Sequence, residues 1–261
     1  MVIGHKKQLA YLNKLVETKK VPHALIFAGP GHIGKRPVAE TIFGESSADT
    51  HIVERDPELS EITIGQIRGL RRWAALSPFN SSRKLIIIDG GEEMNLEGMN
   101  ALLKMLEEPS GETIFIIVTS RLSRLPATIV SRSLVVKFGP VGLEEMAASG
   151  LKVPPAEWEW IAGRPGLVLR FLRDPDDEAV KTRREAFIAA KKIKKSDSTA
   201  KKLKLAEELA AAPDFFATID GLALALKDRT AAFKRLGELK ELFEITTPNK
   251  RIQLEEILLM I

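Results

Sequence analysis

The sequence predicts a three-layer α/β domain over residues 1–139, followed by helical segments as far as residue 261. Two observations predict the α/β domain. Apolar runs typical of buried strands alternate with helix-like segments, and a glycine-rich phosphate-loop pattern stands between the first run and the next helix. A third observation concerns residues 176–261, where apolar residues recur at helical spacing without strand signals. We therefore expect three domains, at 1–139, 140–175 and 176–261.

The composition is that of a globular protein and excludes several classes. The chain has 261 residues, of which 44% are hydrophobic and 28% charged, enough for more than one domain and a sizeable core. No run of about 18 apolar residues occurs, so we expect no membrane span. The basic N-terminus lacks the apolar core of a signal peptide. Cysteine is absent, which excludes disulfides and cysteine-ligated zinc and fits a cytoplasmic protein.

Each predicted element follows from the spacing of its apolar residues. Ile64, Ile67, Leu70 and Ala74 recur every three or four positions, which indicates a helix. The uninterrupted run 85–88 indicates a strand buried on both faces, and hence a parallel sheet. On the same grounds we expect helices at 1–20, 37–43, 64–74 and 94–108, and strands at 24–28, 51–53, 85–89, 113–119 and 134–138.

The glycine loop has the spacing of a nucleotide-binding phosphate loop. Such a loop wraps phosphate with backbone N–H groups, and the following helix presents its positive end. The residues predicted to bind nucleotide here are Gly29, Pro30, Gly31, Gly34 and Lys35. The pattern requires Ser or Thr next, as a magnesium ligand, but Arg36 stands there. We interpret the stretch as a nucleotide loop that keeps its shape and has lost its metal ligand; the alternative is an ordinary glycine turn.

Two further residues are expected at the same edge of the sheet. Asp89 ends a buried strand, where open parallel sheets bind ligands, and in phosphate-loop enzymes such an Asp helps to hold magnesium. Thr119 ends the strand 113–119. The position after Asp89, which usually carries the glutamate that activates water, is Gly90; Glu92 and Glu93 come too late in the chain to replace it. The alternative for Asp89 is a strand-end turn former.

Four motifs in order resemble the AAA+ clamp-loader family of bacterial DNA polymerase III. Residues 94–109, with Asn-Ala-Leu-Leu-Lys-Met-Leu-Glu-Glu-Pro at 100–109, resemble the signature helix of these subunits. Residues 125–133 resemble their Ser-Arg-Cys motif, with Ser133 in the place of cysteine. Residues 62–70 resemble the helix that precedes the Asp-bearing strand. With the altered loop and Gly90, the chain is most similar to delta-prime type subunits.

The resemblance implies a subunit of a hetero-oligomeric machine that opens a sliding clamp and places it on primer–template DNA. The implied partners are an ATPase subunit and a delta-type subunit, and ATP and magnesium would be bound by partner subunits. The chain itself would have no intrinsic ATPase activity, as part of a DNA-directed DNA polymerase holoenzyme. Whether nucleotide still occupies the altered loop stays open. The rival interpretation is an active AAA+ ATPase, such as another clamp-loader subunit or a remodelling motor; the third is a purely structural adaptor.

Arg132 is the one residue to which the resemblance assigns a catalytic role. In the family, the arginine of this motif is an arginine finger, given in trans to the nucleotide of a neighbouring subunit. A guanidinium at that place stabilises charge that develops on the transferred phosphoryl group. The alternative is a surface arginine at a strand start.

Two departures from the family pattern concern other parts of the chain. Family members often carry a cysteine-ligated zinc module after the loop helix, whereas residues 44–50 stand there in this chain. The chain is also shorter than is usual for the family, mainly after Pro140, which leaves open how complete the second and third domains are.

The helical part adds three expectations. Residues 163–166 resemble a turn of the AAA+ lid domain, from which Arg164 or Arg170 would reach a nucleotide; the alternative is a pair of solvated arginines. The apolar tail 252–261 is expected to pack, either in an inter-subunit collar or inside its own domain. Residues 181–204 carry ten basic and two acidic residues, which predicts a solvated helix face in preference to a phosphate-binding patch.

Overall fold

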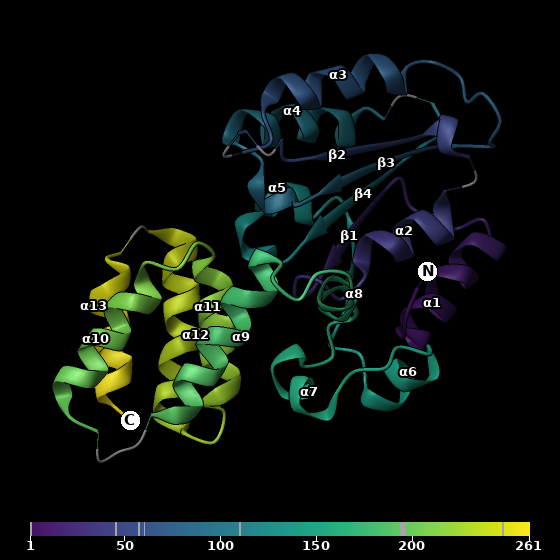
Figure 1. The fold of residues 1–261 in the computed structure, drawn as a ribbon. Helices are drawn as coiled ribbons and strands as arrows, with labels where there is room; N and C mark the ends of the chain where they lie inside the picture. Colours follow the sequence, from purple (N-terminus) through teal and green to yellow (C-terminus); the bar gives the residue numbers. More distant parts are fainter. Residues whose placement is uncertain are drawn as a thin grey trace. The chain divides into compact units, whose positions relative to one another are not determined.

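The structure, a computed structural model, describes residues 2–44, 46–56, 58–59, 61–109, 111–193, 197–246 and 248–261. Its contacts divide the chain into two compact units, Met1–Gly150 with Gly163–Pro165, and Leu151–Ala162 with Gly166–Ile261. Figure 1 shows the sheet of the first unit and the helices of the second. The predicted division at residues 139 and 175 is finer than these two units and stays a prediction.

The first unit is built on a parallel sheet of five strands. The strands lie in the order β2-β3-β4-β1-β5, and every neighbouring pair is parallel. Each crossover between parallel strands needs a connection that returns to the same end, and helices provide it. The strands are β1 (Ala24–Ala28), β2 (Thr50–Glu54), β3 (Lys84–Asp89), β4 (Thr113–Thr119) and β5 (Leu134–Lys137).

Helices cover both faces of this sheet, which gives the predicted three layers (Figure 1). Successive strand residues point to opposite faces, so Leu25 and Phe27 belong to one core and Ala24 and Ile26 to the other. One core is closed by α1 (Lys6–Glu17) and α2 (Lys35–Phe43), and the other by α3 (Ile64–Ala74), α4 (Leu96–Glu107) and α5 (Ala127–Val130). Short elements complete the unit: η1 (Ser47–Asp49), η2 (Gly91–Glu93), η3 (Leu122–Arg124) and α6 (Leu143–Ala148).

Several helix boundaries differ from the predicted ones for local reasons. The helix predicted at 1–20 spans Lys6–Glu17, and Met1 lies outside the described residues. The loop helix begins at Lys35 rather than Pro37, because Gly34 forms its N-cap and proline is tolerated in a first turn. The helix predicted from Met94 begins at Leu96, because the Asn95 side chain caps it.

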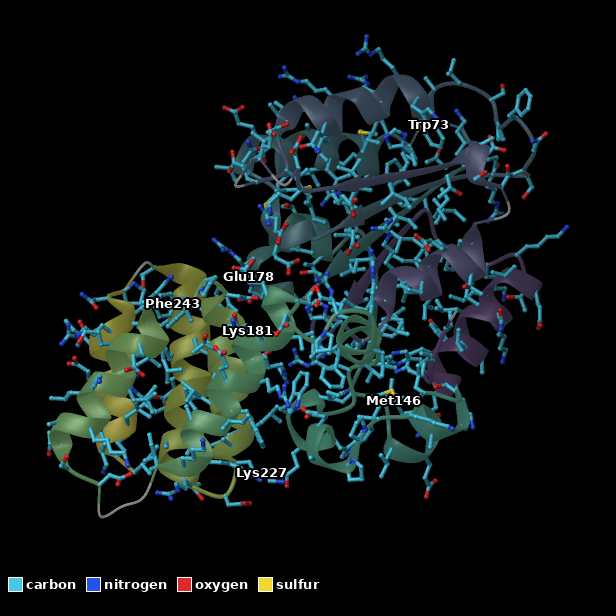
Figure 2. The ribbon with its side chains drawn as sticks, in the orientation of Figure 1. Trp73, Met146, Glu178, Lys181, Lys227 and Phe243 are labelled. Atoms are coloured by element: carbon cyan, nitrogen blue, oxygen red, sulfur yellow. The ribbon has the colours of Figure 1, made fainter. Side chains whose placement is uncertain are left out.

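The second unit is helical throughout its described part. Its largest core joins α9 to α13, and Figure 2 shows Phe243 among the side chains of these helices. The turn predicted at 163–166 lies between two helices, where Ala162 and Gly163 both have positive φ and end the first helix. The helices are α7 (Pro155–Ile161), α8 (Pro165–Arg173), α9 (Glu178–Lys192), α10 (Thr199–Ala210), α11 (Phe215–Ala225), α12 (Thr230–Ile245) and α13 (Lys250–Leu259).

The apolar tail packs one face into this helical core. Leu254, Ile257 and Leu258 are fully buried there, whereas Ile252 and Leu259 are about half exposed. Of the two expectations for the tail, burial inside its own unit is thus observed for one face, and the apolar residues Ile252 and Leu259 stay accessible on the other.

The predicted fold class, a P-loop α/β domain of parallel strands followed by helices, is confirmed by these elements. Within the described part of the chain, none of the helices has the length and apolar composition that a membrane span requires.

Candidate functional site

The phosphate-loop pattern lies between the end of β1 and the start of α2, as its sequence context requires. Two of its glycines are needed for their backbone conformations. Gly29 has a φ of 155°, and a Cβ there would lie 2.2 Å from the carbonyl oxygen of Phe138. Gly34 has a φ of 96° and precedes the first helical residue. Side chains at these positions would be strained or would clash, so both glycines maintain the loop shape. Pro30 and Gly31 complete the turn between them.

Lys35 is folded back against its own loop. Its Nζ donates hydrogen bonds to the carbonyl oxygens of Gly29 and Pro30, both at 2.6 Å, and the residue is only 5% exposed. Burial lowers the pKa of Lys35 from 10.5 to about 8, against the opposing effect of the Glu92 and Asp89 carboxylates. The ammonium group is thus held by backbone oxygens of the loop whose phosphate it was predicted to bind.

Arg36 is the centre of a network of carboxylates at the carboxyl edge of the sheet. Its Nε donates to Glu40 at 2.9 Å, one turn further along α2. Its Nη1 reaches Glu54 at 2.6 Å and Asp89 at 3.4 Å. Glu54 and Asp89 are paired in register at the ends of β2 and β3, so parallel pairing presents both carboxylates to the same guanidinium. Burial raises the pKa of Asp89, and the positive charge of Arg36 opposes that rise.

This arrangement does not fit a magnesium ion. In a phosphate loop, magnesium is held by a hydroxyl after the lysine and by the strand-end Asp. Here a guanidinium, which donates hydrogen bonds and cannot ligate a cation, occupies the first position and is paired with Asp89, the second. Arg36 supplies in its side chain the positive charge that a metal ion would supply.

Glu92 lies close enough to Lys35 to act on its charge, although it was not among the residues predicted for the site. It belongs to the short helix η2, and its carboxylate raises the pKa of Lys35 more strongly than the carboxylate of Asp89 does. It is 8% exposed, and its Oε1 accepts hydrogen bonds from the backbone N–H and the hydroxyl of Ser120. Burial alone would raise the pKa of Glu92, but hydrogen bonds from Ser120 and Thr119 outweigh burial and lower it. A negative charge therefore persists beside Lys35.

Thr119 lies next to Ala28 in the sheet register, at the strand ends from which the loop departs. It is 1% exposed, and its Oγ1 accepts a hydrogen bond from the backbone N–H of Arg121 at 3.0 Å. Its hydroxyl also acts on Glu92. Thr119 thus organises the carboxylate beside the loop.

Arg132 lies at the amino ends of the parallel strands, whereas the loop lies at their carboxyl ends. It follows α5 and precedes β5, whose first residue, Leu134, is in register with Leu25 near the start of β1. The loop begins after the other end of β1, about 13 Å further along the strand at about 3.3 Å per residue. Arg132 is therefore far from the loop of its own chain. If it acts on a nucleotide, that nucleotide belongs to another molecule.

The two lid arginines behave differently. Arg164 belongs to the first unit and is close enough to Lys35 to lower the pKa of that lysine. Arg170 belongs to the second unit, where its Nη1 pairs with Asp177 at 3.1 Å.

The basic stretch 181–204 is partly internal, so its prediction as a solvated face is wrong for some members. Arg183 is 2% exposed; its Nε donates to the carbonyl oxygen of Trp160 at 2.8 Å and its Nη1 pairs with Asp220 at 3.2 Å. Arg184 pairs with Glu157 at 2.7 Å. Lys194 and Lys195 lie outside the described residues. Both arginines join helices of the second unit, and Arg183 is buried and therefore not available to a phosphate backbone.

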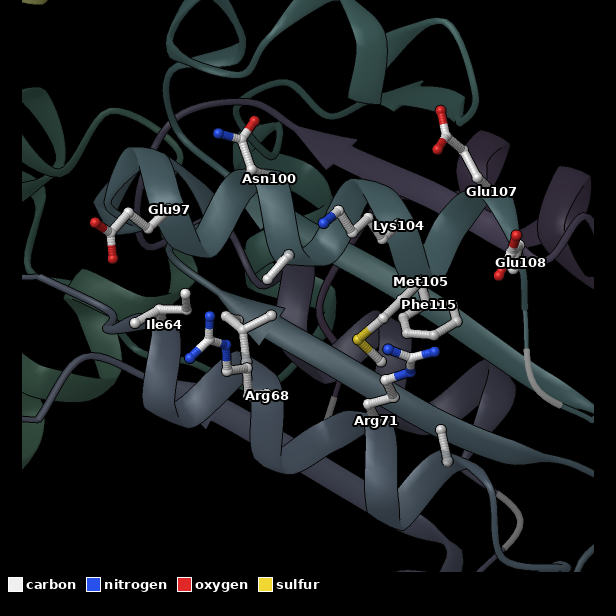
Figure 3. A pocket seen from close by; sticks show the side chains of 13 residues that line it. Ile64, Arg68, Arg71, Glu97, Asn100, Lys104, Met105, Glu107, Glu108 and Phe115 are labelled. Atoms are coloured by element: carbon white, nitrogen blue, oxygen red, sulfur yellow. The ribbon is translucent and has the colours of Figure 1, made fainter.

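A groove lies between α3 and α4 (Figure 3) and has a volume of about 760 Å³. Arg68 and Arg71 line its α3 side, and Lys104 and Glu107 line its α4 side. The α4 wall is the helix that carries the signature motif.

Comparison with known proteins agrees with the motifs. Residues 37–142 match the family model described as DNA polymerase III, delta subunit. That range contains Asp89, Thr119 and Arg132. A DNA polymerase III subunit delta' of Pseudomonas aeruginosa is 32% identical over 134 residues, which are 42% of this chain and 41% of the relative. Residues 37–142 of this chain are thus similar to the corresponding part of clamp-loader subunits.

Other relatives show the same similarity to clamp-loader subunits. A DNA polymerase III subunit delta' of Bacillus subtilis is 28% identical over 149 residues, covering 48% of this chain and 45% of the relative. A replication factor C small subunit of Archaeoglobus fulgidus is 28% identical over 157 residues, which are 58% of this chain and 49% of the relative. The matches thus span less than half the length of these curated relatives.

A solved structure supports the AAA+ fold of the chain. A DNA polymerase III, gamma subunit-related protein from Thermotoga maritima aligns over 96% of this chain and 97% of its own, with a TM-score of 0.51 and 21% identity. At that identity the likeness concerns the fold alone.

Proposed function

We propose that this chain is a delta-prime type subunit of a bacterial DNA polymerase III clamp loader. It assembles with an ATPase subunit and a delta-type subunit, and ATP bound by those partners drives loading of a sliding clamp onto primer–template DNA. Its own loop does not turn over ATP. Its contribution to chemistry is Arg132, given in trans to the nucleotide of a neighbouring subunit.

The observation that carries the proposal is the pairing of Arg36 with Asp89. Hydrolysis in a phosphate loop depends on a metal ion between the loop and the strand-end Asp. In this chain the guanidinium stands in that position, and Gly90 has no carboxylate to orient water. The loop is therefore retained as a structural connection between β1 and α2 and not as a catalytic site.

The position of Arg132 supports the second half of the proposal. It is 41% exposed and lies at the edge of the sheet away from its own loop. An arginine that completes the site of a neighbour must project from its own subunit in this way. The planar guanidinium then offers two parallel N–H donors to phosphate oxygens, which a lysine cannot do.

The first test measures ATP hydrolysis by the purified protein alone. We expect no magnesium-dependent turnover above background, because the metal ligand and the water-orienting carboxylate are both replaced. Steady hydrolysis that is abolished by Lys35→Ala would contradict the proposal. It would favour an active ATPase, in which Glu92 beside Lys35 would be the carboxylate to test by Glu92→Gln.

The second test replaces Arg132 in the reconstituted complex. An arginine finger raises the rate of hydrolysis about 10³- to 10⁵-fold where it completes a GTPase site. Arg132→Ala should remove it from one of several sites, so total ATP turnover should fall in part, while clamp loading falls further. Arg132→Lys should rescue poorly. An unchanged rate, with assembly confirmed by gel filtration, would reduce the chain to a structural adaptor.

A further inference from the structure

Glu107 belongs to two features of the first unit at once. It is the penultimate carboxylate of the signature motif at the end of α4, and it lines the groove between α3 and α4 (Figure 3). On its other side it forms an ion pair with Arg132, with 2.8 Å between Oε1 and Nη2. The motif helix and the arginine motif, 25 positions apart in the sequence, are thus joined through these two side chains.

The ion pair uses the atoms of Arg132 that a phosphate would need. Nη2 donates to Glu107, and Nη1 donates to the carbonyl oxygen of Thr128 at 3.1 Å. These two terminal nitrogens form the fork that grips phosphate oxygens in a bidentate contact. In the described conformation both of them are engaged inside the same chain.

Glu107 pairs with Arg132 although other cations are near. Lys104 stands one turn earlier on the same helix, and Arg71 lines the same groove from α3. In the part of the chain that the structure describes, neither side chain forms an ion pair, and neither does the adjacent carboxylate Glu108. The contact is therefore specific to Glu107 and does not follow from its being one of two neighbouring glutamates.

We propose that Glu107 is a positioning residue, which holds the guanidinium of Arg132 against α4 in competition with the phosphate of a neighbouring subunit. This inference rests on the proposed function, since it assigns Arg132 a phosphate to reach. Both partners are exposed, 41% for Arg132 and 43% for Glu107. Pairs of this kind favour the bound state by a factor of about two to five. A phosphate, with more charge and more acceptor oxygens, displaces so weak a partner.

The experiment compares ATP turnover of the reconstituted complex with five versions of this subunit: wild type, Glu107→Gln, Glu108→Gln, Arg132→Ala and the double variant of Glu107→Gln with Arg132→Ala. Glu107→Gln keeps the size of the side chain and removes the competing charge, so turnover at the site that Arg132 completes should rise about two- to fivefold, and total turnover should rise by less because the other sites are unchanged. The matched control Glu108→Gln should leave it unchanged. In the Arg132→Ala background, Glu107→Gln should have no effect, because the side chain that it holds is absent.

A measurement on the isolated full chain reports the ion pair without any partner. In NMR spectra of the arginine side chains, rotation of the Arg132 guanidinium should be slowed by the contact. Glu107→Gln should restore fast rotation and Glu108→Gln should not. Fast rotation in the wild type would overturn the inference, whatever the complex does.

The remaining outcomes separate the two proposals. If Arg132→Ala lowers turnover but Glu107→Gln leaves it unchanged or lowers it, the holding role of Glu107 is wrong and the proposed function stands. If Arg132→Ala has no effect on turnover, the arginine finger and the role of Glu107 fail together.

Discussion

At the scale of single residues, the positive charge of Arg36 neutralises carboxylates at the carboxyl ends of the strands. The carboxylates of Glu40, Glu54 and Asp89 converge there, and Arg36 is the cation that joins them. Without it, three negative groups would face one another, and like charges this close disfavour the folded state. Arg36 is a permanent counter-ion for these carboxylates, so we expect the strand ends to stay folded without nucleotide or metal.

Arg36→Thr tests this account. It restores the hydroxyl of the phosphate-loop pattern and leaves three carboxylates without a cation. We expect the melting temperature to fall by a few degrees in metal-free buffer and to be recovered by millimolar magnesium, which has little effect on the wild type. ATP turnover should stay absent, because Gly90 is unchanged.

Arg83→Thr is the matched control for that variant, since Arg83 is equally exposed, at 32% against 33% for Arg36, and pairs with a single carboxylate, Glu112. It should show no magnesium response. A melting temperature of Arg36→Thr that ignores magnesium would rule out the view that Arg36 takes the place of a metal ion.

Lys35 makes a prediction about pH. Its folded-state pKa of about 8 lies below the ordinary 10.5, so between these values the folded chain binds fewer protons than the unfolded chain. Stability therefore rises with pH over this window. The unfolding free energy of the wild type should rise relative to Lys35→Met between pH 8 and 10.5, by roughly 2–3 kcal/mol.

Denaturant unfolding of the two proteins at pH 7.5, 9 and 10.5 provides this comparison. Lys20→Met, at an exposed position, controls for the loss of one positive charge. A constant difference between wild type and Lys35→Met across the three pH values would show that the lysine is not desolvated as the structure has it.

At the scale of elements, α4 carries the signature motif, and its last turn fixes the position of the arginine motif. These are two of the motifs that resemble clamp-loader subunits. Asn95 caps its start: Oδ1 accepts from the backbone N–H of Gly98 at 2.8 Å, and Nδ2 donates to Glu61 at 2.9 Å. Glu107 at its last turn holds Arg132. The helix thus runs from a capped N-terminus near the carboxyl ends of the strands to Arg132 near their amino ends.

Asn95→Ala should destabilise the first unit by about 1 kcal/mol, because the first-turn N–H groups lose their acceptor. Asn95→Asp keeps an acceptor and adds a charge that the N-terminus of a helix favours, so it should retain most of the stability. Thermal unfolding of the three proteins measures the difference. Equal melting temperatures for wild type and Asn95→Ala would mean that water satisfies those groups as well as the cap does.

At the scale of the whole molecule, the open question is how the chain joins its partners. The buried face of α13 belongs to the core of the second unit, and its other face leaves Ile252, Leu259 and Met260 accessible. Apolar residues on a C-terminal helix are the surface that the collar interpretation requires. We expect them to contact the partner subunits.

The double variant Ile252→Lys with Leu259→Lys should remain folded, since both side chains are about half exposed, and should lose assembly with the other subunits. Far-UV circular dichroism checks the fold, and gel filtration of the mixed subunits checks assembly. Leu143→Lys changes a side chain in the first unit that is as exposed as Ile252, 57% in each case, and should assemble normally. Full assembly of the double variant would show that the tail only packs inside its own unit and that the collar interpretation is wrong.

Most of the α/β unit could be predicted from local patterns, and the parts that could not have physical reasons. The strand Leu85–Ile88 is recognisable because burial on both faces demands an unbroken apolar run. The influence of Glu92 on Lys35 could not be predicted, because it depends on the short 3₁₀ helix that follows Gly90. Arg183 was expected in solvent because a basic composition does not reveal that Asp220 and a backbone carbonyl meet it from other helices.

The sequence by itself determined the alternation of strands and helices, the glycine positions of the loop and the replacement of a metal ligand by Arg36. All of these depend on residues within one turn or one strand of each other. Only the tertiary structure decided which groups Arg36 and Arg132 meet. The strand order β2-β3-β4-β1-β5 brings Glu54 and Asp89 to Arg36 at the carboxyl ends of the strands. At the amino ends, Arg132 forms an ion pair with Glu107. Strand order and register arise from burial shared across the whole sheet, which no single segment specifies.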